Sequence, residues 1–362
     1  MTVPQQGPKR STLRRLQRSL LHLVRQCLLS LKRYTPFLQW SAVPAASTTY
    51  TAADIIRARS GVRVRMPRGA WDSHMHVFDT DRYPMPPESL YTPPPSLTED
   101  AMAFEATLSI AHIVLVQPSC YGNDNSCMLN ALRQLGPRRA RAVIAFDPAT
   151  TSAAQLQAFH ALGVRGVRIN LQSVGKTLDA ATLRATLQAY ADAVRPLGWV
   201  VQVYVPLPLV VLLEDIVPDL DVRVCIDHMG HPDLATTSEA SAAYRASHNP
   251  YDLEGFASLI TLLKAGSTYV KMSGAYRFFS PKEQRPTPDA YEEVRPIAEE
   301  ILRVAGKHRV VFASDWPHTR YDNLDITSWA EKTMEWCGDA ALIEAVFRDT
   351  ARDLWGVDED DE

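Results

Sequence analysis

Acidic residues are absent from the first 53 residues of this 362-residue chain, although the whole chain contains 41 of them. Eight basic residues give this segment a charge of +8, so residues 54–362 carry −11 within the net charge of −3. A main body with an acidic balance argues against nucleic acid as the principal partner. We therefore expect residues 54–362 to act on a small molecule.

Cysteine is scarce and shows no pattern. The five cysteines are odd in number, and neither a C-x-x-C pair nor zinc-finger spacing occurs. This excludes a disulfide framework and favours reduced thiols in a reducing compartment. The sequence also lacks a G-x-G-x-x-G motif after any strand-like run, which argues against a dinucleotide-binding sheet.

The acid-free segment contains a basic amphipathic pattern. Residues 9–33 combine arginine and serine with leucines at helical spacing, a composition typical of a mitochondrial presequence. A membrane-skimming helix or a disordered extension is the alternative, with a cytoplasmic location. Arg25 interrupts the apolar run, so no stable membrane span is expected here. We predict an extension over 1–53, a linker over 54–69 and one domain over 70–362.

Short β-branched runs alternate with helical patterns throughout that domain. Repeated strand–helix units imply parallel strands, and eight units match a (β/α)8 TIM barrel, here with irregular strand lengths. A doubly wound open sheet is the alternative. The predicted strands are 70–76, 110–117, 141–147, 164–170, 199–205, 222–228, 268–274 and 309–315.

Polar residues gather where the predicted strands end. His74 and His76 stand two positions apart on the first strand, so their side chains project from the same face. Asp315 ends the eighth strand, and His228 ends the sixth. Because barrel enzymes build their sites at the C-terminal ends of the strands, these residues predict one active site. Imidazoles beside a carboxylate suit metal-assisted or acid–base hydrolysis.

Six motifs occur in order on successive strands: WDSHMHVFD, VLVQPSCYGNDN, GVRGVRIN, CIDHMGHP, VKMSGAYR and FASDWPHT. Together with the closing FRDTARDLWG, they resemble the amidohydrolase-related (type 2) branch of the amidohydrolase superfamily over residues 70–355. That branch includes pyrone dicarboxylate and sugar lactonases. The resemblance implies a TIM-barrel hydrolase that opens a lactone in aromatic catabolism or secondary metabolism.

The chain departs from the superfamily pattern at the metal site. Members with two metals carry a lysine or glutamate after strand four and a histidine after strand five, where this chain has Arg168 and Gln202 with Tyr204. The resemblance therefore implies either no required metal or a single divalent ion such as zinc. The ligands of that ion would be His74, His76, His228 and Asp315.

A second departure concerns the substrate. Pyrone dicarboxylate lactonases resemble this chain at Arg168 but carry further arginines where this chain has Val174 and His231. The two arginines that remain, Arg168 and Arg277, are suited to bind a single carboxylate or carbonyl. A lactone with two carboxylates is therefore not the expected substrate.

In the mechanistic hypothesis Asp315 is the general base. The alternative is that Asp315 only caps a helix. His74, His76 and His228 polarise the carbonyl or hold the metal. We expect Asp227 to orient His228 or a neighbouring loop, and Lys271 to act either in catalysis or in a salt bridge within the barrel. The residues assigned to substrate binding are Arg168, Arg277, Ser119, Tyr121, Tyr204 and His318, the last of which is expected mainly to orient its neighbours.

Two other functions remain open at this point. The same branch contains metal-dependent nonoxidative decarboxylases of aromatic or unsaturated acids, and tightly bound metal would favour that activity. A catalytically silent barrel that only binds a ligand is the other alternative. The retention of His74, His76, His228 and Asp315 together argues against it.

Overall fold

The computed structural model describes residues 66–356, except for 88, 90, 173–178, 236–237, 280–289, 319–320 and 322–323. The predicted N-terminal extension, most of the linker and Val174 lie outside these residues. None of the described helices is long and apolar enough to cross a membrane.

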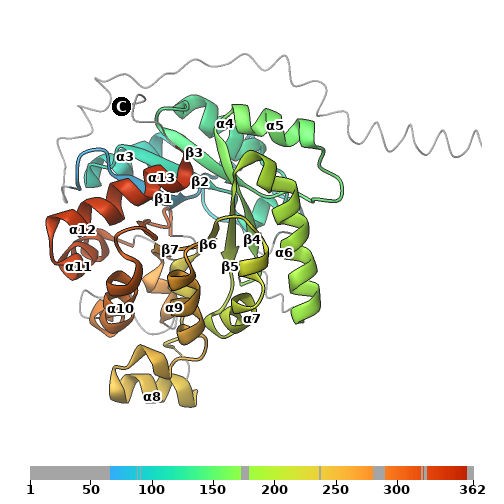
Figure 1. Ribbon diagram of the computed structural model, residues 1–362. Helices are drawn as coiled ribbons and strands as arrows, with labels where there is room; N and C mark the ends of the chain where they lie inside the picture. Colours follow the sequence, from blue (N-terminus) through green and yellow to red (C-terminus); the bar gives the residue numbers. More distant parts are fainter. Residues whose placement is uncertain are drawn as a thin grey trace, which may run out of the picture. The chain divides into compact units, whose positions relative to one another are not determined.

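Eight parallel strands pair in sequence order from β1 to β8 (Figure 1). This order has no reversal point, so the TIM barrel is confirmed and the doubly wound sheet is wrong. The strands are β1 Trp71–Met75, β2 His112–Val116, β3 Ala140–Ile144, β4 Val164–Asn170, β5 Val200–Tyr204, β6 Val224–Ile226, β7 Thr268–Met272 and β8 Val310–Phe312.

Helices lie around these strands (Figure 1). The α-helices are α3 Thr98–Leu108, α4 Ser126–Leu135, α5 Ala153–Ala161, α6 Ala180–Val194, α7 Val210–Glu214, α8 Glu239–Ser247, α9 Phe256–Ala265, α10 Arg295–Ala305, α11 Thr327–Cys337, α12 Ala340–Glu344 and α13 Thr350–Trp355. The short 3-10 segments are η3 Ser119–Tyr121, η4 Arg195–Leu197, η5 Leu207–Leu209, η6 Val217–Asp219, η7 His228–Gly230, η8 Pro250–Asp252, η9 Ala275–Phe278 and η10 Ala290–Glu293, and a π turn, η11, spans Ala345–Asp349.

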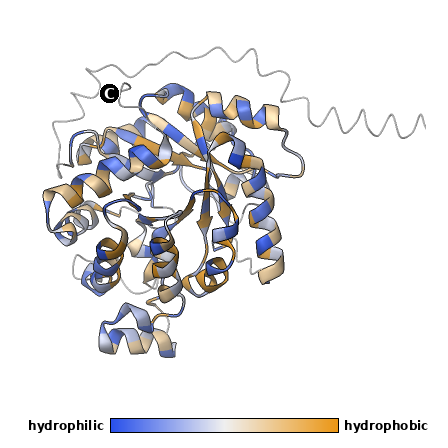
Figure 2. Ribbon diagram, viewed as in Figure 1, coloured by the Kyte–Doolittle hydropathy of each residue, from blue (hydrophilic) through white to orange (hydrophobic). Residues whose placement is uncertain are grey.

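Alternate residues of each strand face different cores. On β2, Ile113 and Leu115 join the large cluster beneath the helices, whereas Val114 and Val116 join the cluster inside the barrel. This is the period-two alternation of a strand that is buried on both faces, and it explains the continuous apolar runs of the sequence. Figure 2 shows the strands as mostly hydrophobic and the helices as mixed.

The C-terminal helix α13 closes the bottom of the barrel. Trp355 is fully buried in the inner cluster with Trp71, the first residue of β1. Its indole Nε1 donates a hydrogen bond of 3.1 Å to Ser73 Oγ. Trp355 therefore fills the N-terminal end of the barrel, opposite to the ends of the strands that carry the predicted site residues.

The barrel closes between β1 and the residues that follow β8. Asp315 N donates to His74 O at 3.0 Å, and His76 N donates to Trp316 O at 2.8 Å. The Asp72 carboxylate spans the same seam, because its Oδ1 accepts from both His74 N and Ser314 N at 3.0 Å. This seam therefore places the end of β1 directly beside Asp315.

Candidate active site at the C-terminal end of the barrel

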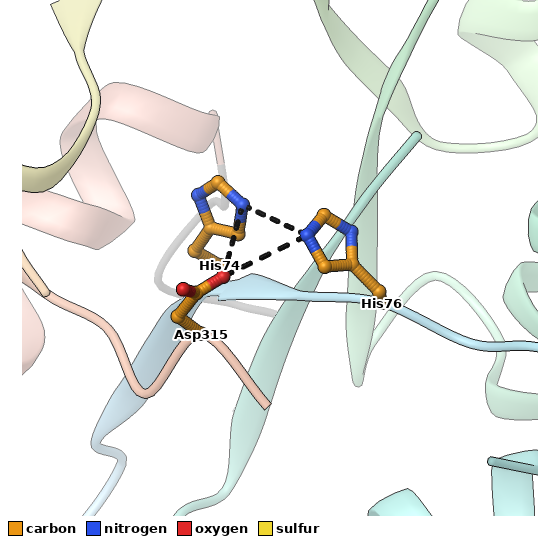
Figure 3. Close-up of side chains that lie close together, drawn as sticks. All are labelled: His74, His76 and Asp315. Carbon is orange, nitrogen blue, oxygen red and sulfur yellow. Dashed lines mark hydrogen bonds and ion pairs between the residues drawn. The ribbon is translucent and has the colours of Figure 1, made fainter. Parts of the chain in front are cut away.

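Three predicted residues form a compact triangle at that seam (Figure 3). His74 Nε2 lies 3.3 Å from His76 Nε2, and Asp315 Oδ1 lies 3.7 Å from each of these two nitrogens. All three side chains are almost fully buried. The alternation of side chains on β1 thus brings the two imidazoles together as the sequence predicts.

His76 presents a lone pair to the site. Its Nδ1 lies 2.7 Å from Val116 O, and a carbonyl can only accept, so Nδ1 carries the proton. Burial lowers the pKa of His76 to about 3, so the ring is neutral and its Nε2 is unprotonated. Such a nitrogen can bind a metal or accept a hydrogen bond, but it cannot donate to a substrate carbonyl. This geometry suits the predicted role of His76 as a metal ligand, and its role in polarising the carbonyl stays a prediction.

Asp315 is held ionised by its neighbours. Tyr276 Oη donates to its Oδ2 at 2.6 Å, and Arg277 Nε donates to the same oxygen at 2.5 Å. Burial opposes ionisation, yet the Arg277 guanidinium and the nearby imidazoles bring the pKa of Asp315 well below its usual range. Arg277, predicted to grip the substrate, thus already contacts the candidate base. Tyr276 was missed by the sequence analysis, although it precedes Arg277 in the VKMSGAYR motif.

His228 approaches Asp315 from the end of β6. Its Nε2 lies 4.0 Å from Asp315 Oδ2, and its Nδ1 lies 2.8 Å from Ser273 Oγ. Gly274 packs against the ring so closely that a Cβ there would lie 2.6 Å from Nδ1. Burial lowers the pKa of His228 to about 4, so the ring is neutral near pH 7. Like Tyr276, Gly274 is a residue of the site that the sequence analysis did not single out.

Asp227 forms an ion-pair contact with His74. Its Oδ1 lies 3.4 Å from both His74 Nδ1 and Lys271 Nζ, and its Oδ2 accepts from Gln202 Nε2 at 2.9 Å. The orientation of His228 or a neighbouring loop by Asp227 stays a prediction, whereas the contact of Asp227 with His74 was not predicted. The sequence analysis missed this pairing because it depends on how β1, β6 and β7 meet inside the barrel.

Arg168 and Tyr204 lie side by side next to the cluster. Arg168 Nη1 donates to Gln117 O at 3.0 Å, and its Nε lies 3.5 Å from Asp227 Oδ2. The guanidinium carbon is 5.6 Å from the centre of the Tyr204 ring. Tyr204 Oη in turn lies 3.0 Å from His231 Nδ1.

The other predicted substrate-binding residues occupy more distant positions. Ser119 Oγ lies 3.3 Å from Tyr91 Oη, whereas the Tyr121 ring stacks on Phe78 at 6.3 Å between centroids. This contact of Tyr121 lies in the core, and its role in substrate binding stays a prediction. His318 is buried against the Tyr276 ring at 5.6 Å, where it can position that tyrosine.

Backbone strain is concentrated in the loops that follow β6 and β8. Among the described residues, eight non-glycine residues have positive φ, and five of these follow β6 or β8. Each such residue costs about 1–3 kcal/mol and persists only where the surrounding structure imposes it, as functional sites often do. The residues concerned are His228, Met229, His231, Asp315 and His318.

The triangle has the dimensions of a metal site. Ligand atoms of a tetrahedral zinc lie about 3.3 Å apart, given bonds of about 2.0–2.1 Å. His74, His76 and Asp315 come close to this spacing, and among the described residues no hydrogen-bond donor reaches Asp315 Oδ1. The residues therefore fit one divalent ion. His228, the fourth predicted ligand, groups instead with His74 and Asp227.

Comparison with known proteins agrees with this geometry. The Amidohydrolase family model matches residues 71–357. A 2-pyrone-4,6-dicarboxylate hydrolase from Comamonas testosteroni is 32% identical over 70% of this chain and 78% of its own length. A 4-sulfomuconolactone hydrolase from Hydrogenophaga intermedia is 30% identical over 72% of this chain and 78% of its own length.

A solved structure supports the same relationship. It comes from Pseudomonas putida, is described as a candidate 2-pyrone-4,6-dicarboxylic acid hydrolase, and is 30% identical with a TM-score of 0.62. The match covers 80% of this chain and 97% of that one. On the fold, the ordered motifs and these matches together, the chain belongs to the amidohydrolase family of hydrolases.

Proposed function

We propose that this protein hydrolyses a lactone that carries one anionic group. The proposal rests on one observation. Ionised Asp315 lies beside neutral imidazoles and near two arginines at the C-terminal end of the barrel. The relatives named above, a pyrone dicarboxylate hydrolase and a sulfomuconolactone hydrolase, support lactone opening and do not favour the decarboxylase alternative.

Asp315 serves as the general base in this proposal. Its Oδ1 has no donor of its own among the described residues and faces the imidazoles, so it can accept a proton from water. The water oxygen then attacks the lactone carbonyl, and the ring C–O bond breaks in the following step. Asp315 returns the proton to the departing alkoxide or enolate oxygen.

The remaining residues position the substrate and stabilise charge. In this proposal His74 and His228 donate to the carbonyl oxygen as negative charge develops on it. Ser273 and Gly274 hold the His228 ring in position. A divalent ion bound by His74, His76 and Asp315 would supply Lewis-acid polarisation of the same carbonyl.

The charge balance of the site supports a single anionic group on the substrate. Three buried or partly buried cations, Arg168, Lys271 and Arg277, face two carboxylates, Asp227 and Asp315. The histidines of the cluster are neutral because burial lowers their pKa values. One positive charge is thus in excess, which matches one carboxylate or sulfonate.

His231 supports the same conclusion. It stands where the resemblance leads one to expect a further arginine, but burial lowers its pKa to about 3. It is therefore uncharged near pH 7 and pairs with Tyr204 Oη at 3.0 Å. A second substrate carboxylate would find no cation at this position.

The test is a panel of lactones that bear zero, one or two carboxylates, assayed before and after chelation together with metal analysis. The proposal predicts hydrolysis of lactones with one carboxylate at the highest kcat/KM. Asp219→Asn, which removes an exposed carboxylate, serves as the matched control for variants of the site. Failure on every lactone, with release of CO2 from an aromatic acid, would replace the proposal with the decarboxylase alternative.

A further inference from the structure

A fully buried lysine lies beneath the two histidines of β1, and the catalytic steps above do not use it. Lys271 Nζ is 2.7 Å from Gln202 Oε1, 3.2 Å from His74 Nδ1 and 3.4 Å from Asp227 Oδ1. An ammonium group has three N–H donors and no acceptor. Its two hydrogen-bond partners, Gln202 Oε1 and His74 Nδ1, therefore have to accept, whereas Asp227 Oδ1 lies near it as an ion pair.

The direction of hydrogen bonding through the histidines leads independently to the same result. Val116 O fixes the proton of His76 on Nδ1, so His76 Nε2 accepts. His74 Nε2 lies 3.3 Å from that nitrogen and has to be the donor between them. A neutral His74 with its proton on Nε2 leaves Nδ1 as an acceptor, which Lys271 satisfies.

Asp227 offers His74 a second arrangement. Its Oδ1 lies 3.4 Å from His74 Nδ1 and has no hydrogen-bond partner of its own among the described residues. If the proton of His74 moves from Nε2 to Nδ1, Asp227 can accept it and Nε2 becomes a lone pair. The net charge is the same in both arrangements, because a single proton changes its position on the ring.

We propose that Lys271 is a positioning residue that holds His74 in the tautomer protonated on Nε2, and that Asp227 stabilises the opposite tautomer when His74 binds a metal. In the first state His74 presents an N–H to the site. In the second it presents a metal ligand beside His76 Nε2. The tautomer assignment stands on hydrogen-bond geometry alone, whereas its use in polarising a lactone carbonyl rests on the proposed function.

The first test is the nitrogen chemical shifts of His74 in metal-free protein labelled with 15N-histidine. His74→Gln identifies the His74 signals by their loss. The proposal predicts a protonated Nε2 and an unprotonated Nδ1 in the natural sequence. Protonated Nδ1 in that protein would overturn the proposal, and this readout needs no variant of Lys271 to fold.

The second test uses Lys271→Met. We expect the proton of His74 to move to Nδ1 in this variant and zinc affinity, measured by competition with a chromophoric chelator, to rise about tenfold, the lower end of the effect of residues behind metal ligands. Arg168→Met is the matched control, because it removes a cation that also neighbours Asp227 but does not touch His74. That control should keep the proton of His74 on Nε2.

Other results count against the proposal in defined ways. An unchanged tautomer in Lys271→Met would refute the role of Lys271. An equal gain of zinc affinity in Arg168→Met would reduce the effect to charge alone. Asp227→Asn should weaken zinc binding at least tenfold and keep the metal-free tautomer; unaltered zinc affinity would refute the role of Asp227. None of these measurements uses a lactone, so they succeed or fail separately from the proposed function.

Discussion

Gly274→Ala is a one-carbon change that should displace the His228 ring. The new Cβ would lie 2.6 Å from His228 Nδ1 and 2.9 Å from its Cγ, where an ordinary contact needs at least 3.4 Å. The ring would therefore have to retreat by about 0.8 Å, and a misplacement of about 1 Å costs about 100-fold in rate. We expect kcat/KM to fall about 100-fold.

The stability effect of this change has two parts. Alanine at φ +63° costs about 1–2 kcal/mol in the left-handed region. Displacement of His228 from Ser273 Oγ adds about 1 kcal/mol for the lost hydrogen bond. The free energy of unfolding should thus fall by about 2–3 kcal/mol, which most domains of this size tolerate.

Gly198→Ala is the matched control. Gly198 has the same φ of +63°, but a Cβ there would meet nothing within 4 Å. In urea titration, the free energy of unfolding of Gly198→Ala should be about 1–2 kcal/mol lower than that of the natural protein. Its kcat/KM on a hydrolysed lactone should be unchanged. Equal activity of folded Gly274→Ala and Gly198→Ala would refute the claim that the position of His228 matters for turnover.

Three further changes test other parts of the account. Arg277→Met should move the acid limb of the kcat/KM profile upward by about 1–3 pH units, because Arg277 keeps the pKa of Asp315 low and only ionised Asp315 accepts a proton; an unmoved limb would contradict that pairing. Arg168→Met should raise KM about tenfold with kcat nearly unchanged, and an unchanged KM would remove Arg168 from substrate binding. Trp355→Ala should lower the free energy of unfolding by about 3–5 kcal/mol in urea titration, and a loss below 1 kcal/mol would refute its role in closing the barrel.

The pairing of Asp315 also has a consequence for folding. Its pKa in the folded protein is lower than in the unfolded chain, so the ionised carboxylate stabilises the fold at pH values above about 4. This contribution is lost as the pH falls through the lower, folded-state pKa. Arg277→Met should remove part of this acid-side dependence.

The barrel could be predicted because its strands are buried on both faces. The runs at 110–117 and 199–205 are apolar and β-branched without alternation, which distinguishes them from amphipathic helices such as Ala180–Val194. The ends of β6 and β8 were placed too far along the chain. His228 and Asp315 leave the sheet for left-handed backbone, a conformation that the local apolar pattern does not predict.

The site could be predicted only as far as single strands determine it. The i and i+2 spacing of His74 and His76 placed both imidazoles on one face, and their measured approach confirms that expectation. Contacts between strands were not accessible in this way. Asp227 reaches His74 and Gly274 reaches His228 because of how neighbouring strands meet in the closed barrel, and one sequence does not specify those meetings.

Turnover by Asp315→Asn tests the central claim most directly. Asparagine keeps an oxygen for Tyr276 and Arg277 but cannot take a proton from water, so kcat on a hydrolysed lactone should fall about 100- to 10,000-fold. Circular dichroism and urea unfolding check that the barrel is intact, and Asp219→Asn should match the natural protein. A folded Asp315→Asn variant with a kcat within a few-fold of the natural value would contradict the account.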